Sequence, residues 1–299
     1  MIKKEDIRPL ILSRREIIKS IGAVALSTLI SPSFSPSSLI SASPVKNEFR
    51  FIVLGDWGCG SDEQLRVAKQ MLLAHQNKPI DFVLTVGDNI YRTGKKKHYP
   101  EYFEKTYDGL LKDEVKFFAT LGNHDVIDGR YDQINYPMFN MGGKGFYTLK
   151  RGQGLVEFFM LDATSIDNEQ LAWFENALKN SSALWKIALF HFPIYSSGSH
   201  HGSDEKLRKI LEPLLIKYNV KTAFTGHEHI YERVKPQNGI QHFVTGGGGA
   251  KLYGIESKSS LTAASYVGWH FMLVEINDKG ISFQTISDMG NLVDSGIIK

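Results

Sequence analysis

The chain contains very little cysteine and no long apolar run, and each absence excludes a class of protein. Cys59 is the single cysteine among 299 residues, so no intramolecular disulfide can form and the fold depends on its core or on bound metal. The apolar stretch at residues 21–30 is shorter than the roughly 20 residues that a bilayer-spanning helix needs. A composition of 42% hydrophobic and 22% charged residues is that of a folded globular protein.

Residues 1–43 have the features of an export signal. The stretch SRREIIK at residues 13–19 precedes the apolar run and a Ser/Pro-rich segment with a small-residue cleavage position near Ala42. Arg14 and Arg15, followed by two isoleucines and a lysine, resemble a twin-arginine signal. The alternative, an N-terminal membrane anchor, is opposed by the short apolar run. We therefore expect export by the twin-arginine machinery, a periplasmic or secreted protein with no stable membrane anchor after cleavage, and one domain over 44–299.

The charge of the chain gives no reason to expect nucleic acid as a partner. Lys and Arg number 35 against 32 Asp and Glu, a net charge of +3. Six basic and three acidic residues fall within 1–43, so the rest of the chain is near neutral. A basic pI that arises in an export signal does not indicate a nucleic-acid-binding face. The basic run 95–97 is interpreted as a solvated loop.

From residue 48 onward, strand-like runs alternate with amphipathic segments. Strands are predicted over 49–55, 80–87, 115–122, 143–152, 153–164, 184–192, 221–226, 239–249, 269–276 and 280–287. Helices are predicted over 62–75, 168–180 and 205–219, with a partly helical stretch at 100–111. Hairpin turns are expected at 151–154 and 277–280. The expected fold class is α/β, with two mixed β-sheets packed face to face and flanked by helices in an αββα sandwich.

Five strand-like runs end in polar residues of the same kind. These residues are, in chain order, Asp56, Asp88, the triplet Asn123, His124 and Asp125, then His191, and the triplet His227, Glu228 and His229. Each alone is a common turn residue, but strand ends converge at one edge of such a core. Carboxylate, amide and imidazole donors suit Zn, Mn and non-haem iron, and they exceed what one tetrahedral ion needs. Two ions bridged by Asp88 are therefore expected.

The order of these motifs resembles that of a known family. GDWG, GDNIY, GNHD, a separate histidine followed by Phe-Pro, and GHEH are arranged as in the calcineurin-like metallophosphoesterases. The tyrosine of GDNIY, Tyr91, is similar to that of the purple acid phosphatases, specifically the small ones that resemble tartrate-resistant acid phosphatase. The resemblance covers most of residues 48–250, and the spacing of about thirty residues between the first three motifs fits it.

Tyr91 bears on which metals are bound. A phenol titrates near pH 10 and is a poor ligand while neutral, but a trivalent cation holds it as the phenolate. The alternative, a tyrosine that packs on the sheet edge, is opposed by the other four motifs. The resemblance implies an Fe(III) site formed by Asp56, Asp88, Tyr91 and His229. It implies a second site, for divalent Fe, Zn or Mn, formed by Asp88, Asn123, His191 and His227.

The resemblance also implies roles for histidines beside the metals. His124 would hydrogen-bond the phosphate or protonate the leaving alcohol, with Asp125 orienting it. A substrate-facing histidine is expected nine or ten residues after His191, and His200 and His201 both fit this spacing. The histidines that match no motif, interpreted as structural or solvated, are His75, His98, His242 and His270.

The expected activity is hydrolysis of small phosphate monoesters by an exported acid phosphatase. The implied reaction is in-line attack by a metal-bound hydroxide, without a phosphoenzyme. The alternatives are a phosphodiesterase or nucleotidase of the same superfamily and a non-catalytic exported metal-binding protein. Tyr91 opposes the first because diesterases generally lack it, and the full ligand set with His124 opposes the second. Residues 253–265 are expected to form a mobile loop over the site.

Overall fold

The computed structural model describes residues 46–255 and 259–299, so the predicted export signal lies outside the described residues. The helices are α1 (Asp62–Asn77), α2 (Asp108–Lys112), α3 (Asp125–Asp128), α4 (Arg130–Ile134), α5 (Asn168–Asn180) and α6 (Glu205–Lys217). Shorter helical turns are η1 (Lys96–His98), η2 (Pro100–Lys105), η3 (Pro137–Phe139) and η4 (Ala163–Ser165). The strands are β1 (Phe49–Leu54), β2 (Phe82–Thr85), β3 (Lys116–Phe118), β4 (Tyr147–Arg151), β5 (Val156–Met160), β6 (Trp185–Leu189), β7 (Thr222–Thr225), β8 (Tyr231–Val234), β9 (Gln241–Thr245), β10 (Thr262–Tyr266), β11 (His270–Asn277), β12 (Gly280–Ser287) and β13 (Leu292–Ile298).

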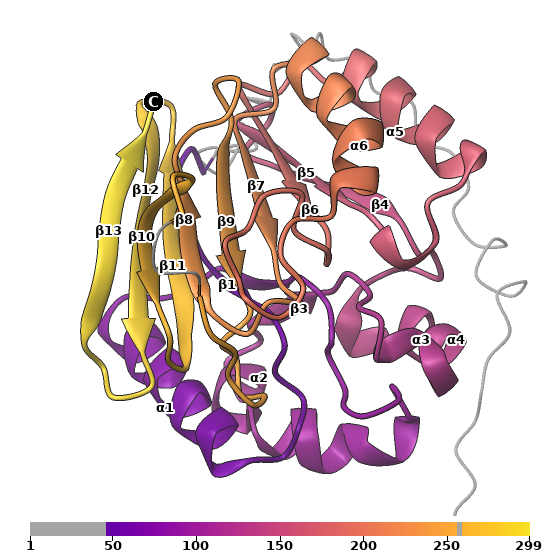
Figure 1. Ribbon diagram of the computed structural model, residues 1–299. Helices are drawn as coiled ribbons and strands as arrows, with labels where there is room; N and C mark the ends of the chain where they lie inside the picture. Colours follow the sequence, from indigo (N-terminus) through magenta and orange to yellow (C-terminus); the bar gives the residue numbers. More distant parts are fainter. Residues whose placement is uncertain (1–45, 256–258) are drawn as a thin grey trace, which may run out of the picture. The chain divides into compact units, whose positions relative to one another are not determined.

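The strands form two mixed sheets (Figure 1). The first has the order β13-β12-β11-β1-β2-β3, in which β1, β2 and β3 are parallel and the others antiparallel. The second has the order β10-β8-β9-β7-β6-β5-β4, with β5, β6, β7 and β9 parallel. The predicted fold class, two mixed sheets with helices, is confirmed.

Strand β1 shows how the sequence makes the layers. Its six residues are all buried because the sheet is covered on both faces. Phe51 and Val53 lie in the core between the sheets, where Phe51 meets Phe158 of β5 edge to face with ring centroids 5.2 Å apart. Ile52 and Leu54 point the other way, into the core beneath α1. Because successive side chains of an extended strand point to opposite faces, β1 contributes to both hydrophobic cores.

Helices α5 and α6 cover the outer face of the second sheet (Figure 1). Phe174 of α5 and Leu211 of α6 pack there against Phe159 of β5. Each helix begins where an aspartate side chain accepts a backbone N–H three residues on, Asp167 from Gln170 and Asp204 from Leu207. Such N-caps typically stabilise a helix by about 1 kcal/mol.

Three described strands were not predicted from the sequence: β8, β10 and β13. The expectation of a mobile loop over 253–265 is wrong for residues 262–265, which belong to β10 and pair with β8. β10 and β13 are edge strands with half-exposed side chains, so they lack the apolar runs of the central strands. The hairpin expected at 277–280 is confirmed, since Asn277 pairs with Gly280.

The carboxyl ends of parallel strands from both sheets meet along one edge of the sandwich. Strands β1, β2 and β3 of the first sheet and β6 and β7 of the second lead into the segments with the predicted site residues. Within the described ranges, no helix is long and apolar enough to cross a bilayer.

Candidate metal centre

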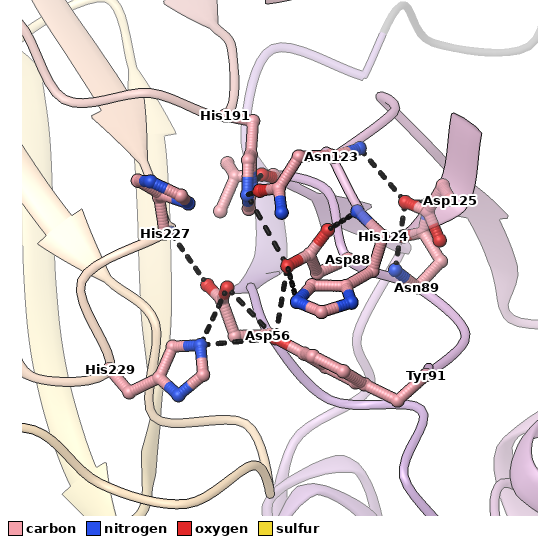
Figure 2. Close-up of polar contacts among 12 residues, drawn as sticks. Asp56, Asp88, Asn89, Tyr91, Asn123, His124, Asp125, His191, His227 and His229 are labelled. Carbon is pink, nitrogen blue, oxygen red and sulfur yellow. Dashed lines mark hydrogen bonds and ion pairs between the residues drawn. The ribbon is translucent and has the colours of Figure 1, made fainter. Parts of the chain in front are cut away.

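Two buried carboxylates form the middle of the site. Asp56 follows β1 and Asp88 follows β2, with exposed fractions of 0% and 1%. Both have left-handed backbones, with φ of 57° and 50°, and so does His227 after β7, with φ of 66°. Non-glycine residues at positive φ cost free energy, and such strain is concentrated at functional sites. The sharp turns bring the carboxylates of Asp56 and Asp88 close together, with His227 beside them (Figure 2).

Backbone groups fix the orientation of each carboxylate. The N–H of His227 donates to Oδ2 of Asp56, and the N–H of His124 donates to Oδ1 of Asp88, both at 2.9 Å. A Cβ at Gly226 would lie 2.4 Å from Oδ2 of Asp56, so only glycine allows this approach. The other oxygens, Oδ1 of Asp56 and Oδ2 of Asp88, face the centre of the site.

Tyr91 and His229 close one side of the carboxylate pair. The hydroxyl of Tyr91 lies 3.2 Å from Oδ1 of Asp56, 3.0 Å from Oδ2 of Asp88 and 3.0 Å from Nε2 of His229. Nδ1 of His229 donates to the carbonyl of Lys251 at 2.6 Å, which leaves Nε2 free for the site. The other three residues predicted for this cation therefore all contact the hydroxyl of Tyr91.

His191 and Asn123 lie on the other side of Asp88. Nε2 of His191 is 3.4 Å from Oδ2 of Asp88 and 3.0 Å from Oδ1 of Asn123. Its Nδ1 donates to the carbonyl of Val86 at 2.8 Å, so this ring also presents Nε2. The ring of His227 lies 5.0 Å from that of His191, measured between centroids. His191 thus contacts two other residues of the second predicted set, Asp88 and Asn123, and its ring lies beside that of His227.

The electrostatics of the cluster favour bound cations. Asp56, Asp88 and His191 each offer one donor atom, and these three atoms lie within 4.8 Å of one another. Burial opposes ionisation of Asp88, but the charges of His191 and His124 bring its pKa below the ordinary value. Burial and the two carboxylates raise the pKa of Tyr91 well above its ordinary value. Two buried carboxylates side by side repel each other unless a positive charge lies between them, so the donor set fits metal ions.

A sequence model of the calcineurin-like phosphoesterase family matches residues 49–231. The chain belongs to this family. Tartrate-resistant acid phosphatase type 5 of Oryctolagus cuniculus is 27% identical over 236 residues, which make up 67% of this chain and 72% of that protein. The family predicted from the motif order is therefore confirmed.

Solved structures share the fold of this calcineurin-like phosphoesterase. GAP50, the anchor in the inner membrane complex of Plasmodium, has a TM-score of 0.74 at 22% identity, over 85% of this chain and 89% of GAP50. Purple acid phosphatase PPD1 from yellow lupin (Lupinus luteus) seeds has a TM-score of 0.64 at 20% identity, over 84% of this chain and 54% of the lupin chain.

In this phosphoesterase, His124 lies beside the cluster but Asp125 does not orient it. Nδ1 of His124 donates to the carbonyl of Arg92 at 2.6 Å, and its ring packs on Tyr91 with centroids 4.6 Å apart. The fully buried carboxylate of Asp125 accepts hydrogen bonds of 2.6 to 3.0 Å from the backbone N–H groups of Asn89, Ile90 and Gly122 and from Nε2 of Gln133. Asp125 instead holds together the loops that follow β2 and β3.

The structure separates the two histidines that the sequence left equivalent. The ring of His201 stacks on that of His227, with centroids 3.8 Å apart and an interplanar angle of 24°. The ring of His200 packs instead on that of Tyr253, with centroids 4.1 Å apart. Both rings are exposed, and His201 is the one in contact with the predicted metal-binding residues.

Glu228 is a residue of this phosphoesterase whose role the sequence did not reveal. It is fully buried between His227 and His229, and its Oε1 accepts the backbone N–H groups of His201 and Gly202. It therefore attaches the loop with His201 to the turn with His227. One indication of such a role was present in the sequence: an acidic residue lies between two predicted ligands but was not itself needed as a ligand.

Proposed function

We propose that this chain is an acid phosphatase that hydrolyses phosphate monoesters at a dinuclear metal centre. The observation that carries the proposal is the meeting of two donor sets that share Asp88, with the hydroxyl of Tyr91 in contact with the first. Membership of the phosphoesterase family and the acid phosphatase among its relatives support the same reaction class. The large exposed cavity next to Tyr91 and His124 gives an ester access to the centre.

Fe(III) is the cation we propose for the first set, Asp56, Asp88, Tyr91 and His229. Because burial and two carboxylates disfavour the phenolate of Tyr91, the cation that holds it must be a strong Lewis acid. A trivalent ion with hard oxygen donors meets this requirement. The clustering of three oxygen donors with a single imidazole supports the assignment.

A divalent ion, Fe, Zn or Mn, is proposed for the second set, Asp88, Asn123, His191 and His227. Burial and the charges of His191 and His201 lower the pKa of His227 to about 2, so its ring is neutral and can act as a ligand. The neutral amide of Asn123 leaves the charge of this ion less compensated than a carboxylate would.

When bound, the two cations supply an activated water as nucleophile and neutralise the charge of the phosphoryl oxygens. We propose that His124 protonates the leaving alcohol through Nε2. This role is supported by the hydrogen bond from its Nδ1–H to the Arg92 carbonyl, which leaves Nε2 4.0 Å from Oδ2 of Asp88. His201, stacked on the proposed ligand His227, is proposed as the residue that contacts the substrate phosphate, whereas His200 packs on Tyr253.

The proposal is tested by metal analysis, an absorption spectrum and a phosphatase assay on the purified protein. We expect iron, a visible band from tyrosinate-to-iron charge transfer, and turnover of 4-nitrophenyl phosphate. Tyr91→Phe retains the ring and is expected to abolish the band while leaving the protein folded. Iron without a visible band would contradict the tyrosinate assignment. Faster turnover of bis(4-nitrophenyl) phosphate than of the monoester would favour a phosphodiesterase.

Export is a separate part of the proposal and rests on the twin-arginine pattern of residues 13–19. A twin-arginine signal is read by a receptor rather than by hydrophobicity alone. Replacing Arg14 and Arg15 with Lys is therefore expected to keep the protein in the cytoplasm, measured by fractionation and phosphatase activity. Normal export of the double variant would indicate the general secretory route.

A further inference from the structure

A large cavity opens on one side of the centre. It has a volume of about 950 Å³, and its wall includes Tyr91, His124 and His229. A single phosphate group occupies a small part of such a volume, which is in the range of pockets for whole ligands. Because His124 is the proposed donor of the proton to the leaving alcohol, the leaving group must lie in this cavity. Its lining therefore bears on which esters are substrates.

Three cationic side chains in the lining have no acidic partner among the described residues: Arg92, Lys97 and Lys251. A fourth, Lys95, lies 3.3 Å from Asp128. Glu63 is the acidic residue of the wall, and it lies 3.5 Å from Arg66 outside the lining. The cavity therefore carries an excess of positive charge. The run 95–97, interpreted from the sequence as a solvated loop, contributes two residues to it.

Two of these cations are attached to the centre through their backbones. The carbonyl of Arg92 accepts the hydrogen bond from Nδ1 of His124, and the carbonyl of Lys251 accepts that from Nδ1 of His229. The Lys251 segment is further fixed because the ring of Tyr253 stacks on His229, with centroids 4.0 Å apart and an interplanar angle of 9°. The backbones that carry these two positive side chains are therefore hydrogen-bonded directly to His124 and His229.

The cavity on the other side of the centre has a different charge pattern. It has a volume of about 610 Å³ and includes His201 and His227 in its wall. Its lining contains two acidic residues, Asp204 and Glu205, and two basic ones, Lys206 and Lys209, whereas the first cavity has four basic residues and one acidic residue. The excess of basic over acidic residues is thus larger on the side with His124 in its wall.

We propose that the substrates are phosphate monoesters whose leaving group carries a second phosphate, and that Arg92, Lys97 and Lys251 bind this second phosphate. The inference rests on the proposed function, since it defines the substrate class of the same centre. Guanidinium and ammonium groups are the usual protein partners of phosphate. The contacts lie near solvent, so each contributes modestly and is screened by salt.

The test uses two matched probes, adenosine 5′-phosphate and adenosine 3′,5′-bisphosphate, with the full chain loaded with Fe(III) and Zn(II). At low ionic strength we expect kcat/KM for the bisphosphate to exceed that for the monophosphate by roughly tenfold or more. A second cleavable phosphate alone accounts for a factor of about two. The preference is expected to shrink as sodium chloride is added.

The double variant Arg92→Gln, Lys251→Gln keeps both backbone carbonyls and removes two charges. It is expected to lower kcat/KM for the bisphosphate about tenfold more than for the monophosphate. Lys96→Gln is the matched control, because Lys96 belongs to the same basic run but is absent from the lining. A preference of about twofold or less in the wild type, or an unchanged preference in the double variant, would overturn the inference.

Binding measurements separate this inference from the proposed function. If neither probe is hydrolysed, the phosphatase proposal fails, and calorimetric titration of both probes then decides the inference. About tenfold tighter binding of the bisphosphate by the wild type, lost in the double variant, supports the subsite. Equal affinity for the two probes contradicts it.

Discussion

At the scale of single residues, the centre is defined by which oxygen of each carboxylate is already occupied. Backbone N–H groups take Oδ2 of Asp56 and Oδ1 of Asp88, so one oxygen of each remains for cations. The sequence predicted both residues, because each follows a strand and a glycine. It could not predict the oxygens, which depend on turns formed by residues far away in the chain.

Replacing Asp88 with Ala is expected to remove both ions, because this carboxylate belongs to both donor sets. Turnover should fall below detection, and metal analysis by mass spectrometry should show less than one ion per chain. Asp128→Ala, which removes an exposed carboxylate, is the control and should keep both ions. Retention of two ions with near-normal turnover in Asp88→Ala would refute the shared-ligand assignment.

Replacing His124 with Ala is expected to lower kcat by about 10² to 10⁴ without loss of metal, the usual range for a lost general acid or base. The ring lies on Tyr91 but makes no contact that the predicted ligand sets require. The same metal content with an altered pH–rate profile would support proton transfer. Metal loss equal to that of Asp88→Ala would instead make His124 a ligand.

At the scale of elements, central strands and long helices were predictable and short edge strands were not. β1, α5 and α6 have the apolar periodicity that burial on one or two faces imposes. β10 and β13 lie at sheet edges, where half of each strand faces solvent and the pattern is lost. The contact between Glu228 and the His201 loop could not be predicted either, because it joins a side chain to two backbone groups far away in the chain.

Glu228 offers a test of how the His201 loop is positioned. Glu228→Gln keeps an oxygen that can accept both N–H groups, whereas Glu228→Met has a similar length and no acceptor. The Met variant loses both hydrogen bonds, each of which typically contributes about 1 kcal/mol, so it is expected to release the loop. KM should rise about tenfold for Met and less than threefold for Gln, with metal content unchanged. Equal kinetics of the two variants would show that the contact has no positioning role.

Strand β9 carries a buried histidine that makes stability depend on pH. Burial lowers the pKa of His242 to about 3, against about 6.5 in the unfolded chain. Between pH 6.5 and pH 3 this histidine is protonated in the unfolded chain but not in the folded one. The free energy of unfolding therefore decreases as the pH falls below 6.5. The loss from this residue is about 2 kcal/mol at pH 5. Urea unfolding of His242→Gln should therefore differ less between pH 7 and pH 5 than that of the wild type, and an unchanged difference would contradict this.

At the scale of the whole molecule, the site joins the two sheets. Asp56, Asp88 and Asn123 follow strands of the first sheet, while His191 and His227 follow strands of the second. Any ion held by both groups connects the halves of the sandwich. Ligands that bind only the native state stabilise it by mass action.

Removal of the ions is therefore expected to lower the melting temperature. At free metal about 100 times the dissociation constant, binding contributes about 2.7 kcal/mol, which corresponds to roughly 5–10 °C for a domain of this size. Differential scanning calorimetry before and after dialysis against a chelator measures the change, with Asp88→Ala as the control that should show none. Equal melting temperatures of the metal-loaded and chelated wild type would contradict this account of the site.

Cys59 lies in the wall of the cavity of about 950 Å³ and is the single cysteine of the sequence, so it is a unique site for covalent labelling. Burial raises the pKa of its thiol, which donates to Oγ of Ser61 at 3.3 Å. Because the thiolate is the reactive form, alkylating reagents will attach slowly at neutral pH and faster in alkaline buffer. Because the chain has no other thiol, a fluorophore or fluorine label attached to Cys59 would report on occupancy of this cavity without removal of other cysteines.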